Sequence, residues 1–93
     1  MYTSEMVATG TGVQLRIVRW GDTHTLSAAP LVLVHGLASN AMLWEGAAQA
    51  FVALGHPVVA VDLRGHGQSE KPDDGYDMQT VTNDVAGLLR VLA

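Results

Sequence analysis

Two short apolar runs dominate the hydrophobic pattern of this 93-residue chain. The first is Leu31–Val34, bounded by Pro30 and Gly36, and the second is Val58–Val61. Apolar runs of this length, without alternation, are typical of strands in a parallel sheet that is covered on both faces. The pattern therefore predicts two central strands, each buried on both faces.

The N-terminal part of the chain shows a different pattern. Apolar and polar residues alternate over 13–19, as in a strand with one buried face, and 4–9 is a weaker strand candidate. Gly10 and Gly12 lie between them, and glycine adopts positive φ at little cost. We predict a hairpin with strands near 4–9 and 13–19, followed by a polar loop over 21–29.

Apolar residues at helical spacing mark two further segments. Ser39 or Asn40 can cap the first helix, and Gly55 followed by Pro57 ends it. Asp77 is a good N-cap for the second helix, which runs to the end of the chain. The expected buried faces are Leu43, Ala47, Ala50 or Phe51 and Leu54 in the first helix, and Met78, Val81, Val85, Leu88, Leu89 and Leu92 in the second.

The order of these elements predicts an α/β fold: a hairpin followed by a parallel strand, helix, strand and helix. A hydrophobic content of 48% and a charged content of 15% fit a globular domain. The net charge of −4, with no basic patch, gives no electrostatic basis for binding nucleic acid. No apolar stretch approaches the roughly 20 residues that span a bilayer.

Cysteine is absent, which excludes disulfides and thiolate metal sites from this sequence. Residues 1–10 lack the basic and apolar regions of a signal peptide. We therefore expect a cytoplasmic protein without nucleic-acid or membrane partners.

Candidate chemistry follows each apolar run. His35-Gly36-Leu37 comes after the first run, and Asp62-Leu63-Arg64-Gly65-His66-Gly67-Gln68-Ser69 follows the second. The carboxyl ends of parallel strands are where open α/β sheets bind ligands. Gly36 lets the backbone turn sharply there, so that a backbone N–H can face a developing oxyanion.

Together the two motifs resemble the front half of α/β-hydrolases, which carry a His-Gly loop after the third strand and an Asp-Leu-Arg-Gly-His-Gly-x-Ser stretch after the fourth. The resemblance extends from about Val13 to Leu92. It implies an incomplete three-layer α/β/α domain over residues 1–93 that stops before the nucleophile-bearing strand. It also implies a strand order of one-two-four-three.

The resemblance assigns roles to both loops. In the family, the residue after His-Gly donates its N–H to the oxyanion, which corresponds to Leu37 here. The surrounding loop then contacts the substrate, and the second motif supports the site without doing chemistry. The expected substrate-binding residues are His35, Gly36, Ala38 and Ser39, and the expected supporting residues are Asp62, Arg64, Gly65 and Gly67.

The supporting residues also have roles that follow from their own chemistry. Asp62 can accept hydrogen bonds from N–H groups of its loop, as aspartates do in turns. Arg64 can pair with a carboxylate, and Asp62 is a candidate partner. Gly65 and Gly67 permit a tight backbone path.

The sequence does not support a catalytic triad within the second motif, a histidine metal site or a dinucleotide-binding loop. Ser69, His66 and Asp62 lie on one loop and do not form a triad, because a triad needs a rigid nucleophile and a base oriented by a buried acid. The four histidines, of which His24 and His56 lie outside the motifs, lack metal-ligand spacing. Gly65-x-Gly67 has no third glycine and does not match a dinucleotide fingerprint. Trp44 is expected to pack against the sheet.

No Gly-x-Ser-x-Gly occurs in the sequence, and no acid and base follow in the family's order. Esterases, lipases and peptidases more often lack the proline that epoxide hydrolases and haloalkane dehalogenases carry soon after His-Gly-x, and Ala38 occupies that position. This favours serine acyl transfer, with an aspartate nucleophile as the alternative. The resemblance implies a small-molecule substrate for the full-length protein and no cofactor. The 93 residues alone are expected to be inactive.

Leu31–Val34 should form an open sheet edge with exposed apolar surface, so we expect poor solubility or loose folding of the isolated chain. A cooperative unfolding transition of a monomer would contradict this expectation. A non-catalytic module remains the other hypothesis; it would be completed by a partner polypeptide or by self-association along this strand.

Overall fold

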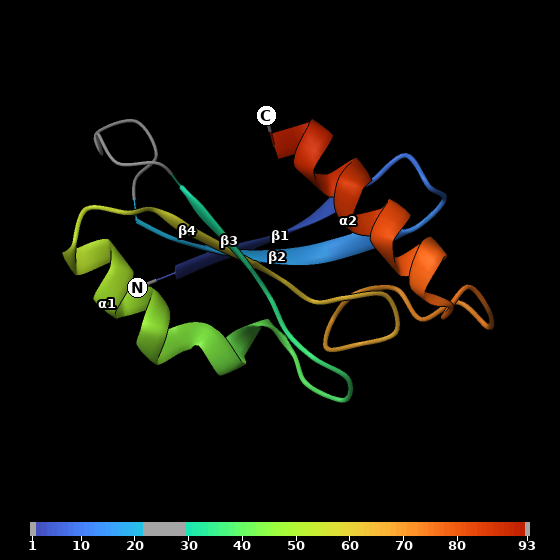
Figure 1. The fold of residues 1–93 in the computed structure, drawn as a ribbon, viewed down its shortest axis with the longest axis horizontal. Helices are drawn as coiled ribbons and strands as arrows, with labels where there is room; N and C mark the ends of the chain where they lie inside the picture. Colours follow the sequence, from blue (N-terminus) through green and yellow to red (C-terminus); the bar gives the residue numbers. More distant parts are fainter. Residues whose placement is uncertain (1, 22–29, 93) are drawn as a thin grey trace.

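A computed structural model describes residues 2–21 and 30–92 (Figure 1). Most of the predicted polar loop, including His24, lies outside the described residues. The elements in chain order are β1 (Tyr2–Ala8), β2 (Gln14–Trp20), β3 (Leu31–Val34), the 3₁₀ helix η1 (Ala41–Trp44), α1 (Glu45–Ala53), β4 (Val58–Val61) and α2 (Met78–Leu92). The hairpin strands begin and end one or two residues from their predicted bounds.

The four described strands form one mixed sheet in the order β1-β2-β4-β3. β2 pairs antiparallel with both β1 and β4, and β3 pairs parallel with β4, from Leu31 opposite Val58 to Val34 opposite Val61. This confirms the predicted strand order. The parallel pair brings the loops after β3 and β4 to the same edge of the sheet.

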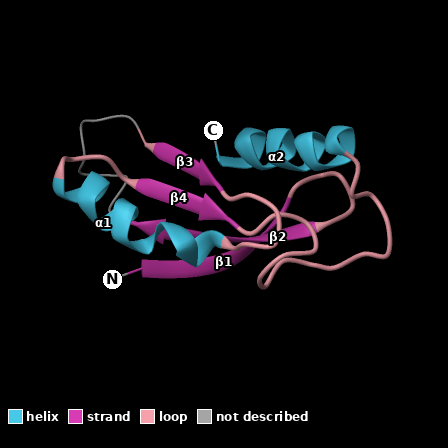
Figure 2. Ribbon diagram, turned by 60° about the horizontal axis from the view of Figure 1, so that its bottom comes forward, coloured by secondary structure: helices cyan, strands magenta, loops and turns pink. Residues whose placement is uncertain are grey.

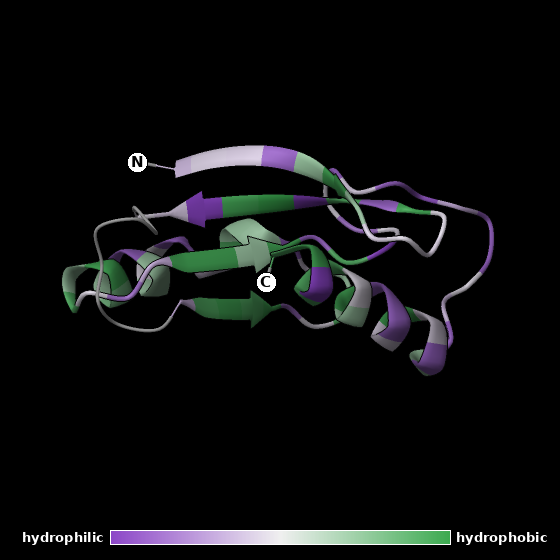
Figure 3. Cartoon of the chain, turned by 90° about the horizontal axis from the view of Figure 1, so that it is seen from above, coloured by the Kyte–Doolittle hydropathy of each residue, from purple (hydrophilic) through white to green (hydrophobic). Residues whose placement is uncertain are grey.

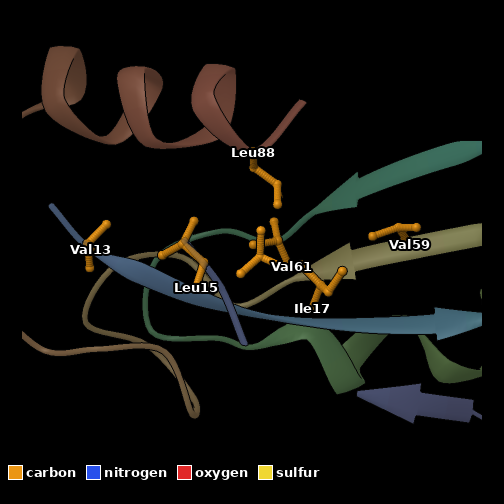
Figure 4. Close-up of a cluster of buried hydrophobic side chains, with 7 residues drawn as sticks. Val13, Leu15, Ile17, Val59, Val61 and Leu88 are labelled. Atoms are coloured by element: carbon orange, nitrogen blue, oxygen red, sulfur yellow. The ribbon is translucent and has the colours of Figure 1, made fainter. Parts of the chain in front are cut away.

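The two helices cover opposite faces of the sheet (Figures 1 and 2). Alternation along β4 sends Val59 and Val61 to the α2 side and Val58 and Ala60 to the α1 side, and all four are buried. Leu88 of α2 packs on the first cluster (Figure 4). The buried residues of that cluster are Val7, Val13, Leu15, Ile17, Val59, Val61 and Leu88.

The predicted caps bound the segment formed by η1 and α1: Asn40 caps η1, α1 itself begins at Glu45, and Gly55 follows its end. The Asn40 side chain accepts a hydrogen bond from the Met42 amide, and η1 provides the first turn before α1. At the other end Gly55 has φ of 95°, and the Gly55 and His56 amides donate to the carbonyls of Val52 and Phe51. This is the Schellman arrangement, and it confirms Gly55 as the residue that ends the helix.

The predicted buried face of this first helix is wrong except at Phe51, which packs partly buried against the sheet. Leu43 and Leu54 are 58% and 75% exposed, whereas Ala41 and Ala48 are buried. The residues that pack on the sheet, Ala41, Trp44, Ala48 and Phe51, do recur at three- to four-residue spacing. Two of them are small alanines, so the larger leucines indicated the wrong face. Trp44 packs partly buried against the α1-side cluster, as expected.

Helix α2 is capped by Asp77, whose carboxylate accepts from the Thr80 amide at 3.1 Å. Its buried residues are Asp84, Gly87 and Leu88, whereas Met78 is 80% exposed. A Cβ at Gly87 would overlap the Thr9 carbonyl oxygen, so the absence of a side chain lets α2 approach the β1–β2 turn. The apolar pattern therefore identified the helix but only part of its packed face.

Strand β3 lies at the edge of the sheet, and its predicted burial on both faces is wrong. Val32 and Val34 are 36% and 42% exposed, because they point to the α2 side of the sheet, where a cavity separates α2 from β3. No described strand lies beyond β3. The expectation of an open, apolar edge is confirmed. Figure 3 shows the apolar residues concentrated on the inner strands and β3, with hydrophilic residues along much of β1. No helix in the described residues has the length and hydropathy to cross a membrane.

Candidate functional site

One buried carboxylate connects the loops that follow β3 and β4. Asp62 is fully buried; its Oδ1 accepts from the Ala41 amide at 2.6 Å and its Oδ2 from the Gln68 amide at 2.9 Å. The Oδ2 atom also lies 3.3 Å from Arg16 Nη1 on β2. Asp62 therefore accepts loop N–H groups as predicted, and it also fixes the start of η1.

The glycines of the second motif make room for this arrangement. Gly67 has φ of 51°, and a Cβ there would overlap the Asp62 carboxylate. Gly65 has φ of 76°, and a Cβ there would overlap the Tyr76 ring. Both positions combine a left-handed backbone with a close contact, which explains why the loop needs glycine at each.

Arg64 pairs with Asp84 of α2, and the suggested pairing with Asp62 is wrong. Arg64 Nε and Nη2 donate to the two Asp84 oxygens at 2.7 and 2.9 Å, and Nη1 donates to the Asp74 carbonyl at 3.2 Å. Thr11 donates a further hydrogen bond to Asp84 at 2.7 Å. The cation beside Asp62 is Arg16 instead, because the register of β2 with β4 places Arg16 next to it.

This network lowers the pKa of Asp84. Burial acts to raise it, but hydrogen bonds from Arg64 and Thr11 and the Arg64 charge outweigh burial, so the pKa lies below the ordinary 3.8. The pKa of Asp77 is lowered as well, first by the hydrogen bond from the Thr80 hydroxyl.

We expect the stability contributed by these two carboxylates to be complete above about pH 4 and to be lost as the pH falls through their folded-state pKa values, because protonation removes the acceptors. Urea midpoints measured between pH 7 and pH 2.5 test this. Asp77→Asn keeps a capping side chain without a titrating group, so the difference between this variant and the wild type measures the contribution of Asp77. A midpoint that stays constant to pH 2.5 would contradict the expectation.

Two histidines connect the same loops reciprocally. His35, after β3, accepts from the Leu63 amide at Nε2 (3.0 Å), and its Nδ1 lies 2.6 Å from the Gly36 carbonyl. His66, after β4, accepts from the Ala38 amide at Nε2 (3.1 Å), and its Nδ1 lies 2.8 Å from the Arg64 carbonyl. The ring centroids are 4.9 Å apart. Each histidine thus holds an amide of the other loop.

A tight turn holds the predicted oxyanion donor. The Ser39 amide donates to the Gly36 carbonyl at 3.3 Å, and Ala38 in the turn has φ of 63°. The amides of Ala38 and Ser39 are engaged, whereas within the described residues the Leu37 amide has no acceptor. The Leu37 side chain is 92% exposed. The turn therefore leaves the Leu37 N–H available to a ligand.

An apolar cavity of about 580 Å³ opens beside this turn, between α2 and the carboxyl end of β3. Its walls include Val34, Leu37, Met78, Val81, Val85 and Leu89, and His35 and His66 supply polar atoms. Among the predicted substrate-binding residues, His35 and Gly36 line the cavity together with Leu37. Ala38 and Ser39 lie in the same turn but outside the cavity wall.

Ser69, His66 and Asp62 are near one another but engaged elsewhere. Ser69 Oγ accepts from the Arg16 amide at 2.7 Å and donates to the Asp62 backbone carbonyl, while His66 contacts Arg64 and Ala38. Ser69 is therefore a buried link to β2. No group of three or more potential metal ligands occurs in residues 2–21 and 30–92.

Sequence reasoning missed Arg16 and Asp84, which are buried and charged at the site. Arg16 lies at a polar position of an alternating strand, and Asp84 lies at a polar position of an amphipathic helix. Such positions usually face solvent. The only indication of these two residues in the sequence is that a buried Asp62 or Arg64 requires a partner of opposite charge.

Comparison with known proteins identifies relatives along nearly the whole chain. A non-heme chloroperoxidase of Streptomyces lividans is 37% identical over 86 residues, which is 92% of this chain and 30% of that protein. Epoxide hydrolase A of Mycobacterium tuberculosis is 36% identical over 94% of this chain and 26% of its own length. An esterase of the same organism is 40% identical over 82% of this chain and 24% of its own length.

Among solved structures, a bromoperoxidase from Bacillus anthracis superposes with a TM-score of 0.84 at 30% identity, covering 97% of this chain and 31% of that one. The chain thus spans about 30% or less of the length of these relatives. The family model described as the alpha/beta hydrolase fold matches residues 29–92. This match, which includes both motifs and all the loops of the site, shows that the chain belongs to the α/β-hydrolase fold family.

Proposed function

We propose that this chain forms the N-terminal, oxyanion-binding part of an α/β-fold hydrolase that cleaves ester-like bonds by serine acyl transfer. The observation that carries the proposal is the free Leu37 amide at the carboxyl end of β3, on the wall of an apolar cavity. The similarity to an esterase over most of the chain supports it. Apolar walls favour a substrate with an apolar acyl or alcohol group.

In this mechanism a serine Oγ attacks the substrate carbonyl carbon while a histidine takes its proton. The carbonyl electron pair moves to the oxygen, and the Leu37 N–H donates a hydrogen bond to that oxyanion. The carbonyl re-forms as the alcohol leaves with the proton from the histidine, and water then hydrolyses the acyl-enzyme. One such donor is worth about 3–4 kcal/mol in the transition state.

The nucleophile, acid and base come from outside these 93 residues in this proposal, because the sequence contains no Gly-x-Ser-x-Gly. The open edge of β3 supports a further strand there, either from the same polypeptide or from a partner chain. A non-catalytic module completed by a partner would use the same edge.

A second candidate is an epoxide hydrolase or dehalogenase with an aspartate nucleophile. The similarity to epoxide hydrolase A over most of the chain favours it. Ala38, in place of the proline expected after His-Gly-x in that branch, speaks for the serine mechanism.

The test is to read the gene through and beyond codon 93, express the whole reading frame and assay p-nitrophenyl acetate and styrene oxide. A Gly-x-Ser-x-Gly motif with ester hydrolysis supports the main proposal. An aspartate in place of that serine, with epoxide opening, supports the second candidate. A stop at codon 94 and no ester hydrolysis would overturn both and favour a module that needs a partner.

A further inference from the structure

The chemistry of their partners fixes the tautomer of both site histidines. A backbone amide can only donate, so Nε2 of His66 must present a lone pair to Ala38. A backbone carbonyl can only accept, so Nδ1 of the same ring must carry its proton toward Arg64. The ring of His35 is fixed in the same way by Leu63 and Gly36. In both rings, therefore, Nδ1 is the donor and Nε2 is the acceptor.

The turn that His66 contacts needs external support. Ala38 is the one non-glycine residue with positive φ in the described part of the chain, and this conformation is unfavourable for a residue with a Cβ. Within the turn, the closing hydrogen bond from Ser39 to Gly36 is long, at 3.3 Å. The His66–Ala38 hydrogen bond is the contact that joins this strained residue to the other loop.

We propose that His66 is a positioning residue for the Leu37 amide. By accepting the Ala38 amide, it holds Ala38 in the left-handed conformation. The Leu37 N–H, on a residue that lines the cavity, then stays without an acceptor in the described part of the chain and remains available to a ligand. This inference rests on the proposed function, since it gives the Leu37 amide an oxyanion to bind. His35 acts from the opposite side by holding Leu63, so that the two loops keep a fixed separation.

The proposal predicts different effects for two substitutions. His66→Phe keeps a ring of similar size but removes the acceptor. His66→Gln places an amide oxygen near the position of Nε2 and can still accept from Ala38. A general loss of packing would affect both variants, whereas loss of the hydrogen bond affects the phenylalanine variant alone. His56→Gln, at a histidine beyond α1 and outside the cavity wall, is the matched control.

The first measurement is amide hydrogen exchange at Ala38 by NMR in the whole encoded protein, which requires no activity. We expect exchange about tenfold faster in His66→Phe than in the wild type, and near-wild-type exchange in His66→Gln and His56→Gln. A coupling across the hydrogen bond between the Ala38 nitrogen and His66 Nε2 is expected in the wild type. Equal exchange at Ala38 in the wild type and in His66→Phe would overturn the proposal.

The second measurement is steady-state ester hydrolysis by the whole encoded protein. We expect kcat to fall about 100-fold in His66→Phe with KM nearly unchanged, and most of kcat to return in His66→Gln. An unchanged kcat in His66→Phe would overturn the positioning role. A wild type without ester hydrolysis would instead refute the proposed function, and exchange at Ala38 would still decide whether His66 holds the turn.

Discussion

Replacing Asp84 by alanine is expected to lower the free energy of unfolding by about 3–5 kcal/mol, because it leaves the Arg64 guanidinium buried without its counter-charge. Arg64 is only 7% exposed and gives two of its hydrogen bonds to this carboxylate. Typical domains are stable by about 5–15 kcal/mol, so the loss would be a large part of the total. Urea unfolding of the whole encoded protein, followed by circular dichroism, measures the loss.

The control for this prediction is Asp73→Ala, which removes an exposed aspartate from the same loop and should change stability by less than about 0.5 kcal/mol. The double variant Arg64→Met with Asp84→Leu removes both charges together. It should be less destabilised than the sum of Arg64→Ala and Asp84→Ala, because no unpaired charge remains. An Asp84→Ala variant as stable as Asp73→Ala would show that the pair contributes nothing.

Replacing Asp62 by alanine is expected to cost a similar amount, about 3–5 kcal/mol, and also to loosen the turn that carries Leu37. The substitution leaves Arg16 buried beside an empty space and removes the acceptor of the Ala41 and Gln68 amides. Since the Ala41 amide begins η1, its release should free the segment that ends the loop after β3. Urea unfolding measures the stability, and amide exchange at Ala41 measures the local effect.

Asp62→Asn separates charge from shape in the same position. It has one acceptor oxygen, so one of the two loop amides would face the asparagine N–H₂ group and remain unpaired. We expect a loss of about 1–3 kcal/mol, smaller than for alanine. Glu45→Gln, on the exposed surface of α1, is the matched control and should be nearly neutral. Unchanged exchange at Ala41 in Asp62→Ala would contradict the role assigned to this carboxylate.

The secondary structure could be predicted where a local rule decides it. The hairpin, the strands at Leu31–Val34 and Val58–Val61, the Asn40 and Asp77 caps and the Gly55 helix end depend on short-range periodicity and on backbone preferences of single residues. The packed faces of the helices were predicted less well, because small alanines occupy the packed face of the first helix while Leu43 and Leu54 are exposed. A glycine and an aspartate occupy buried positions in the second.

By itself the sequence determined the α/β class, the strand order through its resemblance to the family, and the two motifs that meet at the carboxyl ends of β3 and β4. The tertiary structure alone decided the charge partners and the contacts between the loops. Arg16 and Asp62 are 46 residues apart, and Arg64 and Asp84 are 20 apart. Sheet register and helix docking select such pairs, and neither leaves a periodic signal in the chain. The hydrogen bonds that His35 and His66 each accept from an amide of the other loop have the same origin. They form only once two parallel strands bring their loops together, and they leave the Leu37 N–H free.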